Sequence, residues 1–303
     1  MSTVLLTRGM DFQKATTLLA LDRIANRLEP QLRKRFLAAV QASKDRVDLD
    51  MLARAIQSGN VTHAEFAARL AEWPEKYGEL AVDLRAGFLA GGQHAYDLLE
   101  GASYNLRFDL INPYAVSYAQ QKLPQIVQSY VADAKVVIRE IITEAVSGKY
   151  TAQGAAMEIR NHIGLTRLYS GAVRNYRVRL AEQGIIGERL DGKVERYAAK
   201  LLRLRATTIA RTEIIQSQAA GQRALWNEAA NAGLINRMTA QREWMTRFDE
   251  RTCKLCAPMH GARIPFSGVY TQPELGNVDV FGEILNGPPL HPNCRCREVL
   301  ILR

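Results

Sequence analysis

Two short stretches near the C-terminus decide how this sequence can fold: DERTCKLCAPMHG at residues 249–261 and PPLHPNCRCREVLIL at residues 288–302. They hold all four cysteines of the 303-residue chain and two of its five histidines. The residues are Cys253, Cys256, His260, His291, Cys294 and Cys296. The segment between the stretches is rich in proline and glycine and shows little helical periodicity. A loop of this length inside a compact domain is poorly ordered unless something pins it, so the clustering needs a chemical reason.

A metal ion bound by both stretches would close this loop. Zinc prefers thiolate and imidazole ligands, and C-x2-C is the usual first half of a structural site because both sulfurs can reach one ion. The second stretch offers an H-x2-C pair with the same spacing. These patterns predict a zinc site formed by Cys253, Cys256, His291 and Cys294, with Cys296 as an alternative ligand.

Other interpretations of the cysteines stay open at this point. His260 is a weaker ligand candidate because it lies on the loop side of the first pair, and a disulfide between Cys253 and Cys256 competes with metal binding. The longest apolar runs are interrupted by charge well short of the ~20 residues that span a bilayer. The N-terminal sequence shows no signal-peptide pattern. We therefore expect folding in a reducing cytosol, where paired cysteines favour a metal, and four protein ligands favour a structural role for it.

Positive charge is concentrated in the second half of the chain. The formal net charge is +9, and between Arg167 and Arg211 eleven lysines and arginines stand against four aspartates and glutamates, a net charge of +7. Such a band could contact a polyanion such as DNA, or it could be a solvated helix face whose long side chains cover apolar neighbours. The candidate contact residues are Arg174, Arg177, Arg179, Arg196, Lys200, Arg203 and Arg205.

Helical periodicity dominates the sequence before residue 236. Apolar residues recur at three- and four-residue steps over 127–145, and Gly148, Gly164, Gly184 and Gly233 are expected helix stops. These patterns predict a mainly α fold: a helical body with a small irregular α+β C-terminal lobe stapled by zinc. The expected regions are an N-terminal helical region at 1–112, a central helical part at 113–235 and a Cys/His lobe at 236–303.

Several local features carry narrower expectations. Pro30 should interrupt or kink the first helix, and Thr62 with Glu65 has the pattern of a capping box. The adjacent glycines 91 and 92 indicate either a helix break or a close approach of two backbones. Residues 242–252 alternate bulky and polar side chains, as a half-buried strand would.

Candidate catalytic groups are weaker. Arg211 and Glu213 lie two residues apart on different sides of a helix, so each is expected to reach a neighbouring segment. Asp249 and Glu250 beside Arg251 could form a carboxylate pair, but turn chemistry at a strand end is the more common reason for such a trio. We find no P-loop, dinucleotide fingerprint or G-x-S-x-G motif.

Three segments together resemble the phage head-morphogenesis family, the minor head proteins similar to protein F of phage Mu. They are RATTIARTEIIQSQAAGQRALWNEAANAG, REWMTRFDERTCKLCAPMHG and PPLHPNCRCREVLIL, and the resemblance extends from about residue 113 to 300. It implies a virion component that acts in head assembly and is not an enzyme. It also singles out Arg211, Thr212, Glu213, Asp249, Arg251, Thr252, Cys253, Cys256, His291, Pro292, Cys294, Arg295 and Cys296, without a catalytic role for any of them.

The resulting hypothesis is a structural minor head protein, located at the portal vertex or in the capsid interior and present in the host cytoplasm during assembly. Its expected partners are the portal protein, the major capsid or scaffold protein and, secondarily, packaged DNA, with no membrane and no small-molecule substrate. The alternatives are a metal-dependent nuclease or hydrolase and a free DNA-binding protein. An enzyme would need a second, open ligand cluster, and the remaining histidines, His63, His94 and His162, are scattered through expected helices.

Overall fold

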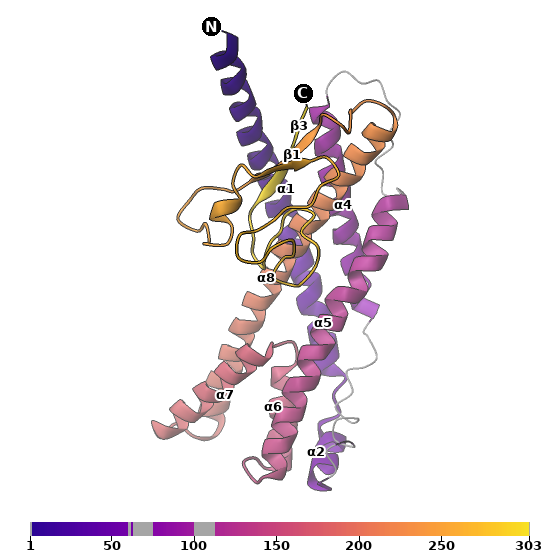
Figure 1. Cartoon of the computed structure of the whole chain (residues 1–303). Coiled ribbons are helices and arrows are strands. Elements are labelled where there is room, and N and C mark those ends of the chain that lie inside the picture. The colour runs from indigo at the N-terminus through magenta and orange to yellow at the C-terminus, as the bar shows by residue number, and fades with distance from the viewer. Residues whose placement is uncertain (1, 60–61, 63–74, 100–112, 303) are drawn as a thin grey trace. The chain divides into compact units, whose positions relative to one another are not determined.

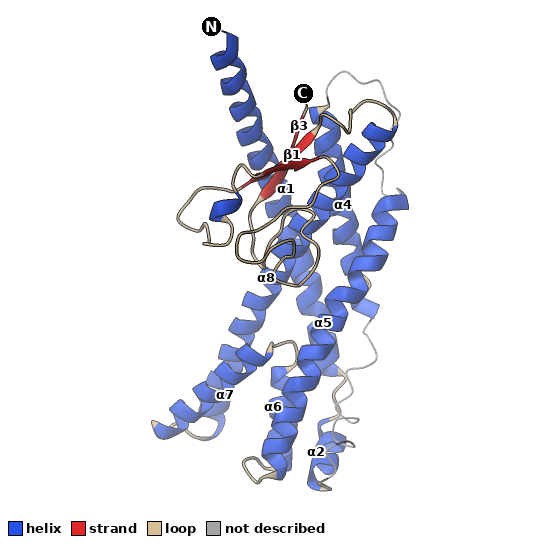
Figure 2. Cartoon of the chain, viewed as in Figure 1, coloured by secondary structure: helices blue, strands red, loops and turns tan. Residues whose placement is uncertain are grey.

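The computed structural model describes residues 2–59, 62, 75–99 and 113–302, with side chains from residue 17 onward. It is 66% helical, with a small three-stranded sheet near the C-terminus (Figure 2). This confirms the expected fold class, a mainly α body with a small α+β C-terminal lobe. His63 and Glu65 lie outside the described residues, so the capping box expected there stays a prediction.

Most described residues before 236 belong to helices, labelled in Figure 1. In chain order they are α1 (Ser2–Asp45), α2 (Leu49–Gln57), the 3-10 helix η1 (Glu75–Tyr77), α4 (Leu80–Leu98), α5 (Pro113–Val146), α6 (Ala152–His162), α7 (Arg167–Glu182) and α8 (Gly187–Asn231). After four of them the backbone turns at a glycine in the left-handed region, with φ of 86°, 90°, 76° and 77° at Gly148, Gly164, Gly184 and Gly233. Glycine adopts this conformation without steric strain, and the expected stops are confirmed.

Pro30 does not interrupt α1, and a kink at this position stays a prediction. The helix continues from Ser2 to Asp45 with Pro30 inside it. A proline removes one helical hydrogen bond, but side chains on both sides of it, Leu28 and Leu32, are buried. Tertiary packing of the apolar face therefore holds the helix across the missing bond.

The paired glycines of α4 mark a close approach of backbones and not a helix break. A Cβ atom added at Gly91 would lie 2.1 Å from the carbonyl oxygen of Gln218 in α8. The same crossing places Gly221 of α8 so that an added Cβ would lie 1.8 Å from the carbonyl oxygen of Phe88. Both separations are far inside van der Waals range, so only glycine fits at either position.

The chain forms two compact units that are discontinuous in sequence. Unit 1 consists of Met1–Leu32, Val82–Ala119 and Thr208–Arg303, and unit 2 consists of Arg33–Ala81 and Gln120–Thr207. In unit 2, α2, α5 and α6 pack side by side (Figure 1) around a core that includes Leu52, Ile141 and Ile159. The three consecutive regions expected from the sequence describe the order along the chain, and their independence as domains stays a prediction.

The C-terminal part of unit 1 holds an antiparallel sheet with strand order β2-β1-β3. Its strands are β1 (Gln241–Met245), β2 (Arg263–Pro265) and β3 (Arg297–Ile301). The expected strand is present, but it is not half-buried: the last four residues of β1 are all buried. Its polar side chains are paired internally, with Arg242 bonded to Glu298 at 2.8 Å and Glu243 to Arg263 at 2.6 Å. The polar side chains that alternate with bulky ones along β1 therefore indicate ion pairs and not solvent exposure.

Candidate metal centre

A hydrogen-bonded turn after β1 delivers the first pair of cysteines. The Asp249 carboxylate accepts a bond from the Arg251 backbone N–H at 3.0 Å. The Thr252 hydroxyl accepts from the Asp249 N–H at 3.1 Å and donates to the carbonyl of Arg247 at 2.7 Å. The expectation of turn chemistry at this strand end is confirmed. The turn leads directly into Cys253.

The C-x2-C segment is itself a tight turn. The backbone N–H groups of Cys256 and Ala257 donate to the carbonyl of Cys253, at 3.2 Å and 3.0 Å. The N–H of Cys256 also lies 3.3 Å from the Cys253 sulfur, to which it donates.

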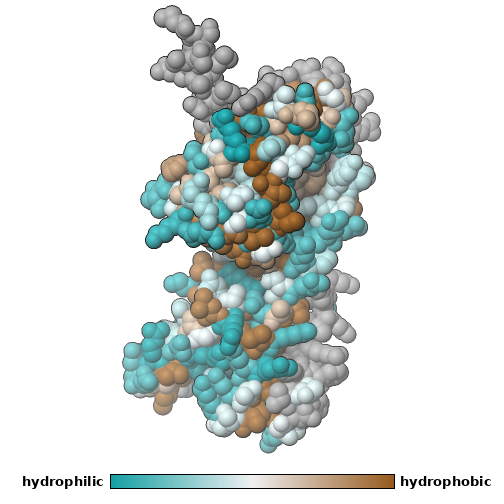
Figure 3. All heavy atoms as spheres, viewed as in Figure 1, coloured by the Kyte–Doolittle hydropathy of each residue, from teal (hydrophilic) through white to brown (hydrophobic). Residues whose placement is uncertain are grey.

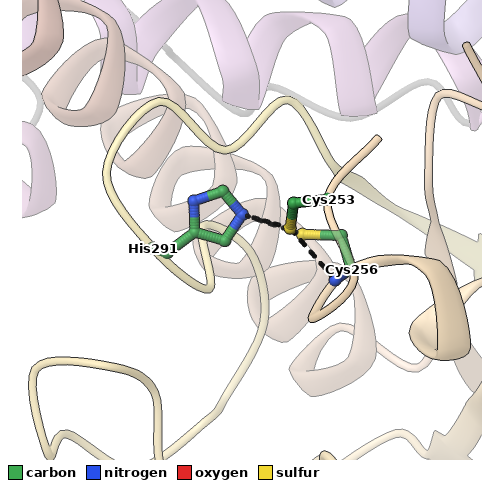
Figure 4. Close-up of side chains that lie close together, drawn as sticks. All are labelled: Cys253, Cys256 and His291. Atoms are coloured by element: carbon green, nitrogen blue, oxygen red, sulfur yellow. Dashed lines mark hydrogen bonds between the residues drawn. The ribbon is translucent and has the colours of Figure 1, made fainter. Parts of the chain in front are cut away.

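His291 faces both of these sulfurs across the loop (Figure 4). Its Nε2 lies 3.0 Å from the Cys253 sulfur and 3.1 Å from the Cys256 sulfur. On the other side of the ring, Nδ1 lies 2.7 Å from the carbonyl oxygen of Pro292, which can only accept. Nδ1 therefore carries a proton, and Nε2 faces the sulfurs. This is the outer contact that orients a metal-binding imidazole.

The two cysteines of the second stretch form a separate group with Cys256, and the sulfur of Cys294 does not lie within 4.8 Å of all three ligand atoms of the first group. The sulfurs of Cys256 and Cys294 are 3.7 Å apart, and those of Cys256, Cys294 and Cys296 all lie within 4.8 Å of one another. A tetrahedron with Zn–S bonds of about 2.3 Å has edges of about 3.8 Å, so the Cys256–Cys294 separation suits two ligands of one ion. All four cysteines are free thiols, and Cys256 belongs to both three-residue groups that could hold a metal.

Hydrogen bonds among these thiols shift their pKa values in opposite directions. The hydrogen bond from Cys256 is the main cause that lowers the pKa of Cys294 well below its usual range, and the bond to Cys294 raises the pKa of Cys256. For Cys296 the bond from Cys256 lowers the pKa, but the bond with Cys294 and burial outweigh it and raise the pKa to about 12. Cation binding to these thiols must release protons, because a metal binds the thiolate form.

Contacts around the ligands tie the second stretch to its surroundings. The Arg295 guanidinium donates two hydrogen bonds to the Asp249 carboxylate, at 2.7 Å and 2.5 Å, and holds the pKa of that carboxyl at about 2. Asn293 has a positive φ of 61° and donates from its backbone and side chain to the hydroxyls of Thr212 and Thr208 in α8, both at 3.0 Å. The sequence did not reveal this role of Asn293. Its one available signal was that asparagine tolerates the left-handed conformation at a turn.

Arg211 and His260 have structural contacts of their own. Arg211 reaches a neighbouring helix, as expected, and donates to Glu29 of α1 at 3.1 Å and 3.3 Å. Nδ1 of His260 accepts from the Thr246 backbone N–H at 3.1 Å, and its ring packs edge-on against Phe248 with ring centres 4.7 Å apart. The ring of His260 therefore contacts the end of β1 and the turn that follows it.

The other described histidines lie in helices, where His162 is buried and His94 is half-buried. His162 lies 2.8 Å from the Ser170 hydroxyl and 3.1 Å from the Glu158 carboxylate. His94 in α4 has a buried Nε2 without a hydrogen-bond partner among the described residues, and burial lowers its pKa. Neither histidine belongs to the Cys/His cluster.

Some of the basic residues proposed for a polyanion contact are engaged in internal ion pairs. Arg174 bonds to Glu140 at 2.6 Å and to Glu144 at 3.1 Å. Arg177 bonds to Glu158 at 2.5 Å. These side chains brace α7 against α5 and α6, so their charge is already partly neutralised.

Arg205 is also committed inside unit 2. It is buried, bonds to Asp133 at 2.7 Å and donates to the carbonyl of Gly164 at 2.9 Å. A buried guanidinium cannot reach a ligand without leaving these partners. The remaining four candidates lie at exposed positions: Arg179, Arg196, Lys200 and Arg203.

Together these features define a mainly helical protein whose C-terminal lobe is built around a Cys/His cluster suited to a metal ion. Comparison with known families gives a more particular result. The family model described as Phage Mu protein F like protein matches residues 137–299, just over half of the chain and all of the cluster. The chain belongs to this family, and the resemblance seen in its motifs is confirmed. No curated protein and no solved structure matches it.

Family membership points to phage head morphogenesis and, with it, to the virion. In the parts of the chain that the structure describes, no helix has both the length and the apolar character needed to cross a bilayer.

Proposed function

We propose that the chain is a structural minor head protein of a tailed phage, carried in the virion at the portal vertex or in the capsid interior. The observation that supports this best is the family match over residues 137–299, which runs from α5 through β3. The protein acts by contact through its helices and is not an enzyme. Its purified form should therefore show no cleavage of DNA or peptide when divalent metals are added.

The metal centre has a structural role in this proposal. Zinc is the cation that three thiolates and one imidazole suit best. Cys253, Cys256, His291 and Cys294 would fill its coordination shell, with Cys296 as the alternative fourth ligand. A shell filled by protein leaves no position for a reacting water. The ion would hold together the two ends of the 257–290 loop.

The proposed partners are the portal protein and the major capsid or scaffold protein, with packaged DNA as a secondary, sequence-independent partner. Phage particles should therefore contain this chain, and it should co-purify with portal protein. Ionic interactions weaken steeply with salt, whereas packed helical interfaces do not, so portal association should survive salt that removes DNA.

Co-purification at low and raised ionic strength, with portal and DNA measured in the same sample, tests this proposal. An unrelated cytosolic protein measured in the same phage particles is the control. It shows how much protein is trapped in particles without specific binding. The proposal would be contradicted if the chain were absent from purified particles, or if portal protein dissociated from it at the same salt concentration as the DNA.

A further inference from the structure

The first half of α8 carries a stripe of five basic side chains on one helical face. They recur at steps of four, three, four and three residues: Arg189, Lys193, Arg196, Lys200 and Arg203. At 100° per residue these positions fall within an arc of about 80°, and the stripe is about 21 Å long. We call these five residues the α8 basic stripe. Arg189 and Lys193 extend it beyond the residues singled out in the sequence.

The α8 basic stripe lies opposite the packed face of the helix. Val194, Ala198, Leu201 and Leu202 are buried on the other side. Four members of the stripe are exposed and Lys193 is half-buried. The whole stripe lies within unit 2, so its geometry depends on one helix of one unit.

The stripe differs from four other arginines of unit 2 in having no carboxylate partner. Arg167, Arg174, Arg177 and Arg205 each form an ion pair with an acidic side chain. Among the residues that the structure describes, no member of the stripe forms one. The acidic residues of the same helical segment, Glu188, Asp191 and Glu195, lie outside the arc, and Asp191 is bonded to Arg177.

The charges within the stripe repel one another, because residues three and four apart are neighbours on a helix surface. Repulsion of this kind disappears when a polyanion supplies the opposite charge. No aromatic or aliphatic side chain falls within the arc of the stripe, and the exposed Leu204 lies just beside it. A protein interface would use a cluster of such side chains as an anchor. Hydrophilic residues cover much of the molecular face drawn in Figure 3, with hydrophobic ones in narrow patches between them.

From this geometry we propose that the α8 basic stripe binds the phosphate backbone of duplex DNA without reading its sequence. The proposal rests on the proposed function, in which packaged DNA lies close to the protein. A straight row of cations about 21 Å long spans about six base pairs of one strand. Each side chain that neutralises a phosphate releases counterions, and five such side chains predict a slope of about −4.5 for the logarithm of affinity against the logarithm of salt.

The test uses the purified full-length chain and a duplex of random sequence, with affinities measured from about 50 to 200 mM salt. A stripe variant, Arg196→Gln/Lys200→Gln/Arg203→Gln, should bind far more weakly, and its slope should be smaller in magnitude by about 2.7, because three phosphates are no longer neutralised. The matched control is Lys34→Gln/Lys76→Gln/Lys135→Gln. It makes the same change in net charge at exposed lysines of three other elements and should retain most of the slope. Circular dichroism checks that both variants fold.

Equal loss of affinity in the two triple variants would overturn the stripe, because net charge alone would then explain binding. A stripe variant that keeps the wild-type slope but no longer binds portal protein would overturn it too, in favour of an acidic protein surface. The proposed function is tested separately. If the chain is present in particles but the stripe variant binds DNA as the wild type does, only the stripe proposal is refuted. If the salt slope depends on the stripe but the chain is absent from particles, only the virion role is refuted.

Discussion

At the scale of single residues, His291 shows how one backbone group prepares a ligand. The Pro292 carbonyl accepts a hydrogen bond from Nδ1 of the ring at 2.7 Å, and Nε2 on the other side of the ring faces two sulfurs. The ring is thus oriented before any cation binds. A pre-oriented ligand loses less conformational entropy on binding, and this favours the metal interpretation of the cluster.

Protein purified without chelator should contain about one zinc per chain, and Cys253→Ser should reduce this content strongly, because ligation energy in such sites is folding energy. The variant should also expose residues 257–290 to protease while the helical circular dichroism signal is largely kept. Elemental analysis and limited proteolysis measure both effects. Lys254→Ser, at the exposed position beside the ligand, is the control. A metal-free, fully folded lobe with four titratable thiols would rule out the site.

The fourth ligand can be assigned with a matched pair of variants. Cys294→Ser should reduce zinc affinity at least about tenfold, because the sulfur of Cys294 lies at a tetrahedral edge length from that of Cys256. Cys296→Ser should reduce zinc affinity less, since the sulfur of Cys296 also contacts the Thr246 hydroxyl at 3.7 Å. Competition with a coloured chelator compares the two affinities. The reverse order would assign Cys296 as the ligand.

The ligand cluster could be predicted from the sequence because its members come in local pairs, each pair bringing its own spacing. The hydrogen bonds of Asn293 could not. They join residues 81 and 85 positions apart, and nothing at Thr208 or Thr212 indicates a distant partner. A local pattern predicts which residues bind, and only tertiary structure shows what holds them in place.

At the scale of secondary-structure elements, β1 was mispredicted as half-buried for a physical reason. Arg242 and Glu243 point to opposite faces of the strand, yet each finds an oppositely charged partner and both are buried. A polar residue in a strand indicates solvent exposure only if no oppositely charged side chain lies close enough to pair with it. Helix stops were predicted well, because a glycine in the left-handed conformation is a local requirement.

The crossing of α4 and α8 predicts opposite effects for two glycine-to-alanine changes. Gly91→Ala should destabilise the protein by at least about 2 kcal/mol, because the new methyl group would overlap the Gln218 carbonyl and backbone cannot yield as a side chain can. Gly171→Ala in α7, where an added Cβ meets nothing within 4 Å, should stabilise it by up to about 1 kcal/mol. Thermal or denaturant unfolding of both variants checks the contrast. Destabilisation of equal size would show that α7 is not a regular helix there.

Glu158 should make the stability of unit 2 depend on acid pH. Burial alone would raise its pKa, but hydrogen bonds and charge interactions with His162 and Arg177 outweigh it and lower the pKa. A lowered folded-state pKa means that the contribution is present above the ordinary glutamate pKa of about 4.3 and is lost as pH falls through the folded-state value.

Glu158→Gln should therefore destabilise the protein by about 3 kcal/mol at neutral pH, because it leaves the Arg177 guanidinium without its buried carboxylate partner. The difference from wild type should shrink as the pH is lowered below about 4. Unfolding by urea across a pH series measures both. Glu182→Gln, at an exposed position near the end of α7, should stay within about 0.5 kcal/mol of wild type at every pH. A pH-independent difference for Glu158→Gln would contradict the ion-pair account.

At the scale of the whole molecule, the chain forms two units that its sequence does not predict. Helices α1, α5 and α8 each contribute one part to unit 1 and another to unit 2. Composition changes near residue 236 suggested a boundary there, but the lobe that begins at that point packs with segments from the start and middle of the chain. The ion pair of Arg297 with Asp22, at 2.9 Å, joins positions 275 residues apart. Hydrophobic periodicity is a local pattern, so it predicts the helices but not how each helix is divided between the two units.

This division predicts where the loss of metal should be felt. The whole Cys/His cluster lies in unit 1, whereas α6 and α7 lie in unit 2. Removal of the metal with a chelator should therefore increase amide exchange in β1, β3 and the 257–290 loop, because the ligands no longer fix the ends of that loop. Residues of α6 and α7 should keep their protection, since their packing against α2, α5 and α8 involves no ligand.

Hydrogen exchange measured by mass spectrometry, before and after chelation and again after zinc is restored, makes the comparison. The Cys253→Ser variant treated with the same chelator controls for effects of the chelator itself. Loss of protection spread evenly over both units would show that the metal stabilises the molecule as a single cooperative body, and the two-unit description would then be wrong.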